Sequence, residues 1–235
     1  MEGACPLAWS FDAAGWFARD ADMLMRVGRV LLQEDGAPPR AGELLYADDA
    51  FALVAADVKK VFEPAVARVV SVLGAPRHVT VSAEGLPQWF QVFRTLQAAE
   101  AWAQHGAWIR QFKPQFGPGV RERFEWAATL TPEQVAPLKE KREAIAHQMS
   151  EMLANNAVLV LPTVHTIAPL CNTPPADLDD FRGRAMSLLC IAGLARLPQI
   201  NLPLAKFDGA PLGLSLIAAR GNDLMLLELA RRITA

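Results

Sequence analysis

Apolar positions in the last quarter of the chain, residues 181–233, follow first a helical and then a strand period. The helical part has apolar residues every three or four positions, which predicts one buried helix face. These residues are Phe181, Ala185, Leu188, Leu189 and Ala192. Asp179 and Asp180 precede this helix, and Gly193 is expected to end it in a left-handed conformation.

After Gly193, apolar residues recur at every second position, as in a β-strand. Residues 199–204 and 212–217 are short runs with alternating apolar residues, and Asp208-Gly209 lies between them. Because glycine readily adopts the positive φ that a tight turn requires, this arrangement predicts a β-hairpin. Pro203 and Pro211 lack an amide donor, so we expect them near strand ends or on a sheet edge.

Helical periodicity predicts further helices along the chain. Asp20 is expected to cap a helix at residues 21–32, and a capping box from Thr131 and Gln134 to begin one at 131–155. A helix at 51–73 is expected to kink or break at Pro64. Further helices are expected at 87–105 and after a cap at Asn222 or Asp223.

One apolar run differs from the others because it has no polar position. Residues 157–161 read Ala-Val-Leu-Val-Leu, which is typical of a central strand covered on both faces. Residues 43–47 and 78–82 predict shorter strands. Helices alternating with such strands predict an α/β fold, with a layered mixed sheet flanked by helices, in one domain.

Composition narrows the classes of function. Charged residues make up 20% of the chain and nearly cancel to a net charge of −2, which argues against a nucleic-acid groove or a basic membrane-binding patch. No apolar run approaches the roughly 20 residues of a transmembrane helix. We therefore expect a cytoplasmic protein with neither nucleic-acid nor membrane partners.

The cysteines and histidines indicate neither a disulfide framework nor a metal site. Cys5, Cys171 and Cys190 are an odd number at unrelated spacings. The histidines, His78, His105, His147 and His165, lack the paired spacing of metal ligands. We expect no metal and no cofactor.

Two motifs resemble the amidase signature family. Ser10-Phe11-Asp12-Ala13-Ala14-Gly15 is similar to the family's Ser-Phe-Asp-Thr-Val-Gly segment, with Ala at two positions where Thr and Val are usual. Near the other end, the family's glycine and proline pattern matches Gly193, Leu197, Pro198, Pro203, Gly209, Pro211 and Gly213. The sequence Trp16-Phe17-Ala18-Arg19 most resembles the branch of the family that includes plant-type indole-3-acetamide hydrolases.

The resemblance implies an amidase-signature-like fold whose N-terminal half is missing, so that residues 1–235 are a partial amidase domain. Family enzymes use a Ser-Ser-Lys set in and before a Gly/Ser-rich stretch, and this sequence has no such stretch. We therefore expect no catalytic residues here. Ser215 and Lys206 lie in the predicted hairpin region and are the candidates for a substitute pair, but a strand serine and a solvated lysine are the simpler interpretation.

The resemblance also implies that Thr163, His165 and Ile191 are substrate-binding residues, because the family's Pro-Thr loop and the helix before the Gly-Leu-Pro strand contribute to the acyl pocket. For His165 alone, a loop histidine with one hydrogen bond is the plainer interpretation. The expected ligand of the completed protein is a small, aromatic amide.

Three interpretations remain open. The chain is either part of an amide hydrolase, inactive alone, or a non-catalytic subunit that self-associates or binds a complementary amidase chain, because a half-domain leaves sheet edges and apolar faces uncovered. The aromatic stretch from Trp89 to Trp126 also suggests a small-molecule binding module, although large aromatic residues most often fill a core.

Overall fold

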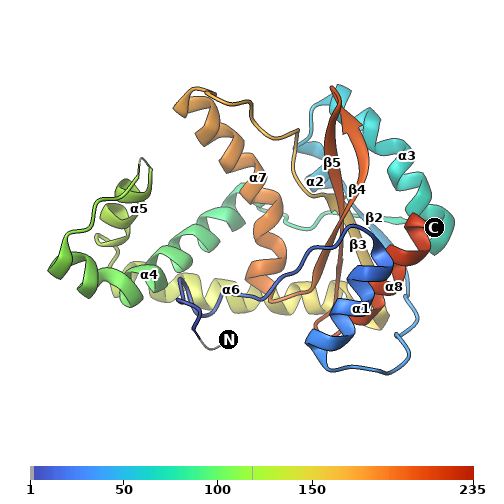
Figure 1. The fold of residues 1–235 in the computed structure, drawn as a ribbon, viewed down its shortest axis with the longest axis horizontal. Helices are drawn as coiled ribbons and strands as arrows, with labels where there is room; N and C mark the ends of the chain where they lie inside the picture. The colour runs from blue at the N-terminus through green and yellow to red at the C-terminus, as the bar shows by residue number, and fades with distance from the viewer. Residues whose placement is uncertain (1–2, 118) are drawn as a thin grey trace.

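The computed structural model describes residues 3–117 and 119–235, and these form one mixed five-stranded sheet with helices on both faces (Figure 1). The order across the sheet is β2 (Arg77–Val79), β1 (Leu44–Ala47), β3 (Val158–Pro162), β5 (Ala210–Ala218) and β4 (Gln199–Phe207), so β3 is central. β1 runs parallel to β2 and β3, whereas β5 runs antiparallel to β3 and β4. The predicted α/β class is confirmed.

Helices form a layer on each face of the sheet. The described helices are α1 (Ala21–Leu32), α2 (Asp48–Ala52), α3 (Ala56–Leu73), α4 (Leu86–Phe112), α5 (Val120–Ala127), α6 (Pro132–Met152), α7 (Pro175–Ala195) and α8 (Asp223–Thr234), with a 3-10 turn at Ala154–Asn156. One layer contains α1, α3 and α8, and the other α4, α6 and α7, with α5 beyond the far end of α4 (Figure 1). None of the helices in residues 3–117 and 119–235 has an apolar stretch of the length that crossing a bilayer needs.

The central strand explains why the core has two halves. Val158 and Val160 of β3 point into the cluster with α1, α3 and α8, while Leu159 and Leu161 point into the cluster with α4, α6 and α7. All five residues of β3 are buried. An apolar run without polar positions is therefore required, because successive side chains of a strand point to opposite faces.

Two predicted helix starts are confirmed in atomic detail. The Asp20 carboxylate accepts a hydrogen bond from the Met23 amide at 2.7 Å, so it caps α1. At α6, the Gln134 side chain accepts from the Thr131 amide at 2.9 Å, as a capping box requires.

The prediction of one helix over 51–73, kinked or split at Pro64, is wrong in where the helix is split. α2 ends at Ala52 and α3 begins at Ala56, so the split lies at residues 53–55. Pro64 lies inside α3 on its exposed side, where water can hydrogen-bond the carbonyl group that has lost its amide partner.

The prediction that Gly193 ends its helix is also wrong. α7 begins at Pro175 and continues to Ala195, and Arg196 takes the left-handed conformation with φ 57°. Gly193 lies within the helix, where an added Cβ would come 3.1 Å from the Phe93 ring. Its absent side chain therefore allows α4 and α7 to pack closely.

The predicted hairpin is confirmed. Asp208 and Gly209, with φ of 47° and 78°, form the two-residue turn between β4 and β5. Positive φ at both positions is the type I′ geometry that matches the twist of antiparallel strands. Pro203 lies on the edge strand β4, where the register shifts between Leu202 and Ala205.

Candidate functional site

Polar side chains meet at the carboxyl end of the central strand β3. The Thr163 hydroxyl lies 2.6 Å from Asn201 Oδ1 and 2.7 Å from the Ser215 hydroxyl. Gln199 Nε2 donates to Ser215 Oγ at 2.7 Å. We call Gln199, Ser215, Thr163 and Asn201 the polar relay.

The relay has one consistent direction. The Thr163 hydroxyl has a single proton, which it donates to Asn201, so the proton between Thr163 and Ser215 comes from Ser215. Ser215 in turn accepts from Gln199. Each hydroxyl therefore donates once and accepts once, which fixes the rotamers of both.

A glycine makes room for this relay. A Cβ at Gly213 would overlap Asn201 Oδ1 and would lie 2.8 Å from the Thr163 hydroxyl. The Gly213 carbonyl also accepts a hydrogen bond from the Thr163 amide at 2.9 Å. The loop after β3 is thus attached to the hairpin through both main chain and side chain.

His165 lies two residues further along the same loop and is only 5% exposed. Its ring lies 5.1 Å from the Phe181 ring in the second turn of α7, and its Nδ1 has no hydrogen-bond partner in the described chain. Burial, assisted by the positive charge of Arg184, lowers the pKa of His165, while Asp180 partly opposes this shift. The histidine is therefore neutral at pH 7 and retains an unused ring nitrogen.

The third predicted binding residue lies in a different environment. Ile191 is fully buried on α7, in the cluster shared by α4, α6 and α7. Thr163 and His165 thus share a loop, whereas the Ile191 side chain fills the core. The assignment of these three residues to a substrate pocket stays a prediction.

Groups considered for nucleophilic chemistry have other roles here. Ser215 is fully buried within the polar relay, and Lys206 stands opposite Pro211 near the hairpin turn, away from Ser215. Burial raises the pKa of the Cys190 thiol to about 12, so it remains protonated. Cys171 is exposed and free. Within the described residues no group of three His, Cys, Asp or Glu side chains is arranged to hold a metal ion.

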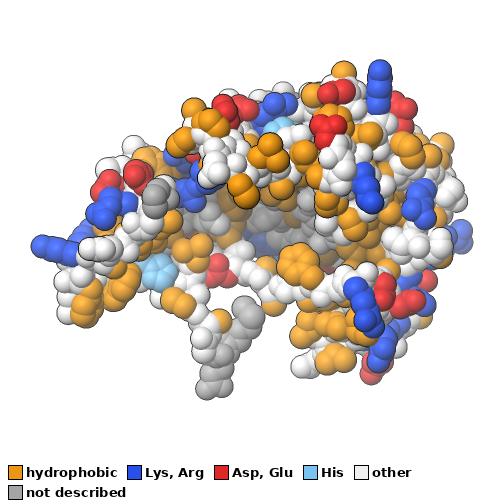
Figure 2. Space-filling model, turned by 45° about the horizontal axis from the view of Figure 1, so that its top comes forward, with side chains coloured by type: hydrophobic (Ala, Val, Ile, Leu, Met, Phe, Trp, Pro, Cys, Tyr) orange, Lys and Arg blue, Asp and Glu red, His pale blue; other side chains and the backbone are white. Residues whose placement is uncertain are grey.

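The aromatic residues between Trp89 and Trp126 lie in three different environments. Trp89 is buried in the core, while Trp108 and Phe112 are exposed at the far end of α4. Trp102, Phe116 and Phe124 line a surface hollow of about 330 Å³ between α4 and α5. Hydrophobic side chains also reach the surface among charged ones on the face shown in Figure 2.

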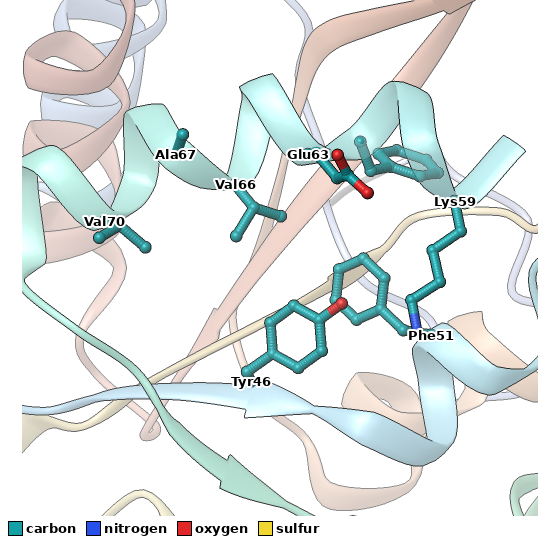
Figure 3. Close-up of a pocket in the computed structure, with 8 residues that line it drawn as sticks. Tyr46, Phe51, Lys59, Glu63, Val66, Ala67 and Val70 are labelled. Carbon is teal, nitrogen blue, oxygen red and sulfur yellow. The ribbon is translucent and has the colours of Figure 1, made fainter.

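A larger hollow, of about 430 Å³, lies between β1, α2 and α3 (Figure 3). Its lining residues are Tyr46, Phe51, Lys59, Phe62, Glu63, Val66, Ala67 and Val70. Neither hollow includes Thr163, His165 or Ile191 in its lining.

Sequence reasoning did not identify the relay partners or the hollow beside Tyr46. Gln199 and Asn201 alternate with buried Ile200 and Leu202, so the period of two carried a signal that both amides share a face. No local pattern joins Tyr46 to residues 59–70, because that hollow forms only when α3 packs beside β1.

Comparison of the sequence with known proteins finds relatives that align with nearly the whole chain. The chain is 34% identical to Amidase 1 of Arabidopsis thaliana and 29% identical to Amidase 1 of Oryza sativa subsp. japonica, in each case over 99% of the chain. It spans 62% and 60% of the lengths of these two proteins. No protein-family model matches the chain.

Solved structures agree on the fold. A crystal structure of an amidase superposes on 99% of this chain with a TM-score of 0.86 at 24% identity, and this chain covers 55% of it. A bacterial aryl acylamidase of the amidase signature enzymes family superposes on 82% of the chain with a TM-score of 0.63 at 16% identity.

Proposed function

We propose, from the similarity to Amidase 1 and to a solved amidase, that residues 1–235 form the carboxy-terminal part of a domain of the amidase signature family. The observation that supports this most directly is the match to Amidase 1, which includes nearly all of this chain but 62% of that protein. We propose that the completed domain hydrolyses a small amide, of aromatic and indoleacetamide-like type, to an acid and ammonia.

In this proposal the chain contributes structure to the site and the reacting groups come from elsewhere in the domain. Amide hydrolysis needs an activated nucleophile and donors directed at the oxyanion. The Ser215 hydroxyl already donates and accepts within the relay. The relay is well suited to hold the Thr163–His165 loop as a rigid pocket wall, because its hydrogen bonds connect that loop to both strands of the hairpin.

Ammonia release from indole-3-acetamide tests this function. We expect none from the purified chain. We expect hydrolysis from a chimera in which the part of Amidase 1 outside the match is joined to this chain. Hydrolysis by the chain alone would place the catalytic groups inside residues 1–235, and an inactive but folded chimera would argue against an amidase role.

A second candidate is a non-catalytic subunit, and exposed apolar side chains favour it. Trp9, Phe17 and Val30 are 77%, 101% and 76% exposed, and burial of such side chains against a partner would remove apolar surface from water. An active chimera would exclude the purely non-catalytic role.

We propose that the protein acts in the cytoplasm. Its free cysteines are compatible with that reducing compartment.

A further inference from the structure

The hollow between α4 and α5 is lined by three half-buried aromatic rings. Trp102 comes from α4, Phe116 from the loop that follows it, and Phe124 from α5. The Phe116 and Phe124 rings stack with centroids 5.2 Å apart. The volume of about 330 Å³ lies at the lower end of the roughly 300–1,000 Å³ that small-molecule sites occupy. Its size and its rings suit a planar aromatic molecule.

The Trp102 ring is held in place by its own helix. A Cβ at Gly106, one turn further along α4, would come 2.8 Å from the ring, so the indole lies close against the helix backbone. The Arg110 guanidinium lies over the ring, with its Cζ 4.9 Å from the ring centroid. Because the ring is fixed before a ligand arrives, less side-chain entropy is lost on binding.

Two cations stand at the rim of the hollow. Lys113 ends α4 in the left-handed conformation, with φ 44°, and Arg121 lies in the first turn of α5. Both side chains are exposed, and in residues 3–117 and 119–235 neither forms a salt bridge. Glu125 also lines the hollow, so two cations face one carboxylate there. The excess of positive charge favours an anion, and the Arg121 guanidinium can bind a carboxylate through two parallel hydrogen bonds.

The hollow is separate from the polar relay. α5 packs on α4 and lies beyond its far end, away from the sheet (Figure 1). Among the described residues, the lining of this hollow includes no member of the relay and none of the three predicted binding residues. A ligand bound here would therefore leave the carboxyl end of β3 free.

We propose that the hollow between α4 and α5 binds a planar aromatic carboxylate. The aromatic group would pack on the Trp102 and Phe124 rings, and the carboxylate would face Arg121 and Lys113. The aromatic acid that the proposed hydrolysis would release belongs to this class, but the hollow would bind such a molecule from any source.

A membrane surface is the competing occupant. Trp108 and Phe112, near the end of α4, are 47% and 62% exposed, and aromatic residues beside cations are typical of membrane-surface helices. Insertion into a bilayer needs apolar side chains that project from a helix face, whereas the three rings of the hollow line a concave surface. The concave lining favours the small molecule.

Equilibrium dialysis of the purified 235-residue chain against naphthalene-1-acetate tests the site. We expect the wild type to bind it, and Arg121→Gln to bind it about tenfold more weakly, because a charged hydrogen-bond donor is lost. The matched control is Arg123→Gln, which removes the same charge from an exposed position of α5 outside the lining of the hollow. It should change the affinity about twofold or less. Thermal unfolding of both variants verifies that they fold.

The two chemical groups of the ligand are tested separately. Naphthalene-1-acetamide keeps the rings but has no charge, so it should bind about tenfold more weakly than the acid. Cyclohexylacetate keeps the charge without an aromatic ring, and we expect an equal concentration of it not to displace the acid.

Three results would overturn the site: no binding of the acid at millimolar concentration, equal affinity for the acid and the amide, or equal affinity of the Arg121→Gln and Arg123→Gln variants for the acid. If the chain instead binds vesicles of anionic phospholipid, and Arg121→Gln weakens that binding while the acid does not bind, the occupant is a membrane surface and our assignment is wrong. The activity of the chimera decides the proposed function in each of these cases.

Discussion

Tyr46 is the single tyrosine of the chain, so its ionisation can be followed by ultraviolet absorbance without other phenols contributing. Burial beside Phe51, and then the negative charges of Asp48 and Glu63, raise the pKa of Tyr46 from 10.0 to about 12. The neutral phenol is therefore favoured in the folded state. Its contribution to stability is complete below pH 10 and is lost as the pH rises through about 12.

We predict a tyrosinate absorbance change with its midpoint clearly above pH 10 in the folded chain. Adding urea to unfold the chain should return the midpoint to about 10. Tyr46→Phe, which should show no such change, identifies the signal. A midpoint near 10 in folded protein would mean that the Tyr46 hydroxyl is fully hydrated and that the hollow is more open than the structure indicates.

At the scale of one element, the hairpin β4–β5 depends on a glycine for close approach. Gly213→Ala would push a methyl group into Asn201 and the Thr163 hydroxyl, so we predict a loss of about 1–3 kcal/mol in the free energy of unfolding. Urea denaturation measures this loss.

A second glycine gives the matched control for that measurement. Gly183 lies inside α7 with open space around its Cβ position, so Gly183→Ala should stabilise the chain by about 0.5–1 kcal/mol. Equal effects of the two substitutions would show that the relay is not packed as described.

At the scale of the whole molecule, residues 8–20 connect the two helical layers. Phe11 packs edge-on against Phe93 of α4 at 4.9 Å, whereas Trp16 packs on the opposite layer and donates to the Leu24 carbonyl at 3.1 Å. The Ser10 end of the segment is held by Arg142, which is 4% exposed. The Arg142 guanidinium lies over the Phe11 ring and donates to the Ser10, Gly193 and Leu194 carbonyls.

Removing this arginine should therefore detach the segment. We predict that Arg142→Ala costs about 3 kcal/mol in the free energy of unfolding, because buried acceptors lose a charged donor. It should also speed tryptic cleavage at Arg19. Arg196→Ala removes an arginine from an exposed pair with Glu143 and should cost about 1 kcal/mol or less. If both variants lost the same stability, the buried network would have no special role.

Much of this architecture was predictable because its signals are local. The caps of α1 and α6, the Asp208-Gly209 turn and the apolar run of β3 each depend on residues close in sequence. Predictions at Pro64 and Gly193 were wrong for a related reason. A proline is tolerated where its helix faces water, and a glycine can be needed for packing rather than for its φ, and neither is visible in local sequence.

The sequence by itself determined the fold class, the order of the elements and the resemblance to amidases, since hydrophobic periodicity, turn residues and short motifs are encoded along the chain. Tertiary structure decided which distant residues meet. It brought Thr163 to Asn201 and Ser215, buried Ile191 in the core, and formed the hollow where α3 faces Tyr46. Such contacts depend on how the two helical layers pack on a shared sheet, and that packing is set by side chains far apart in sequence.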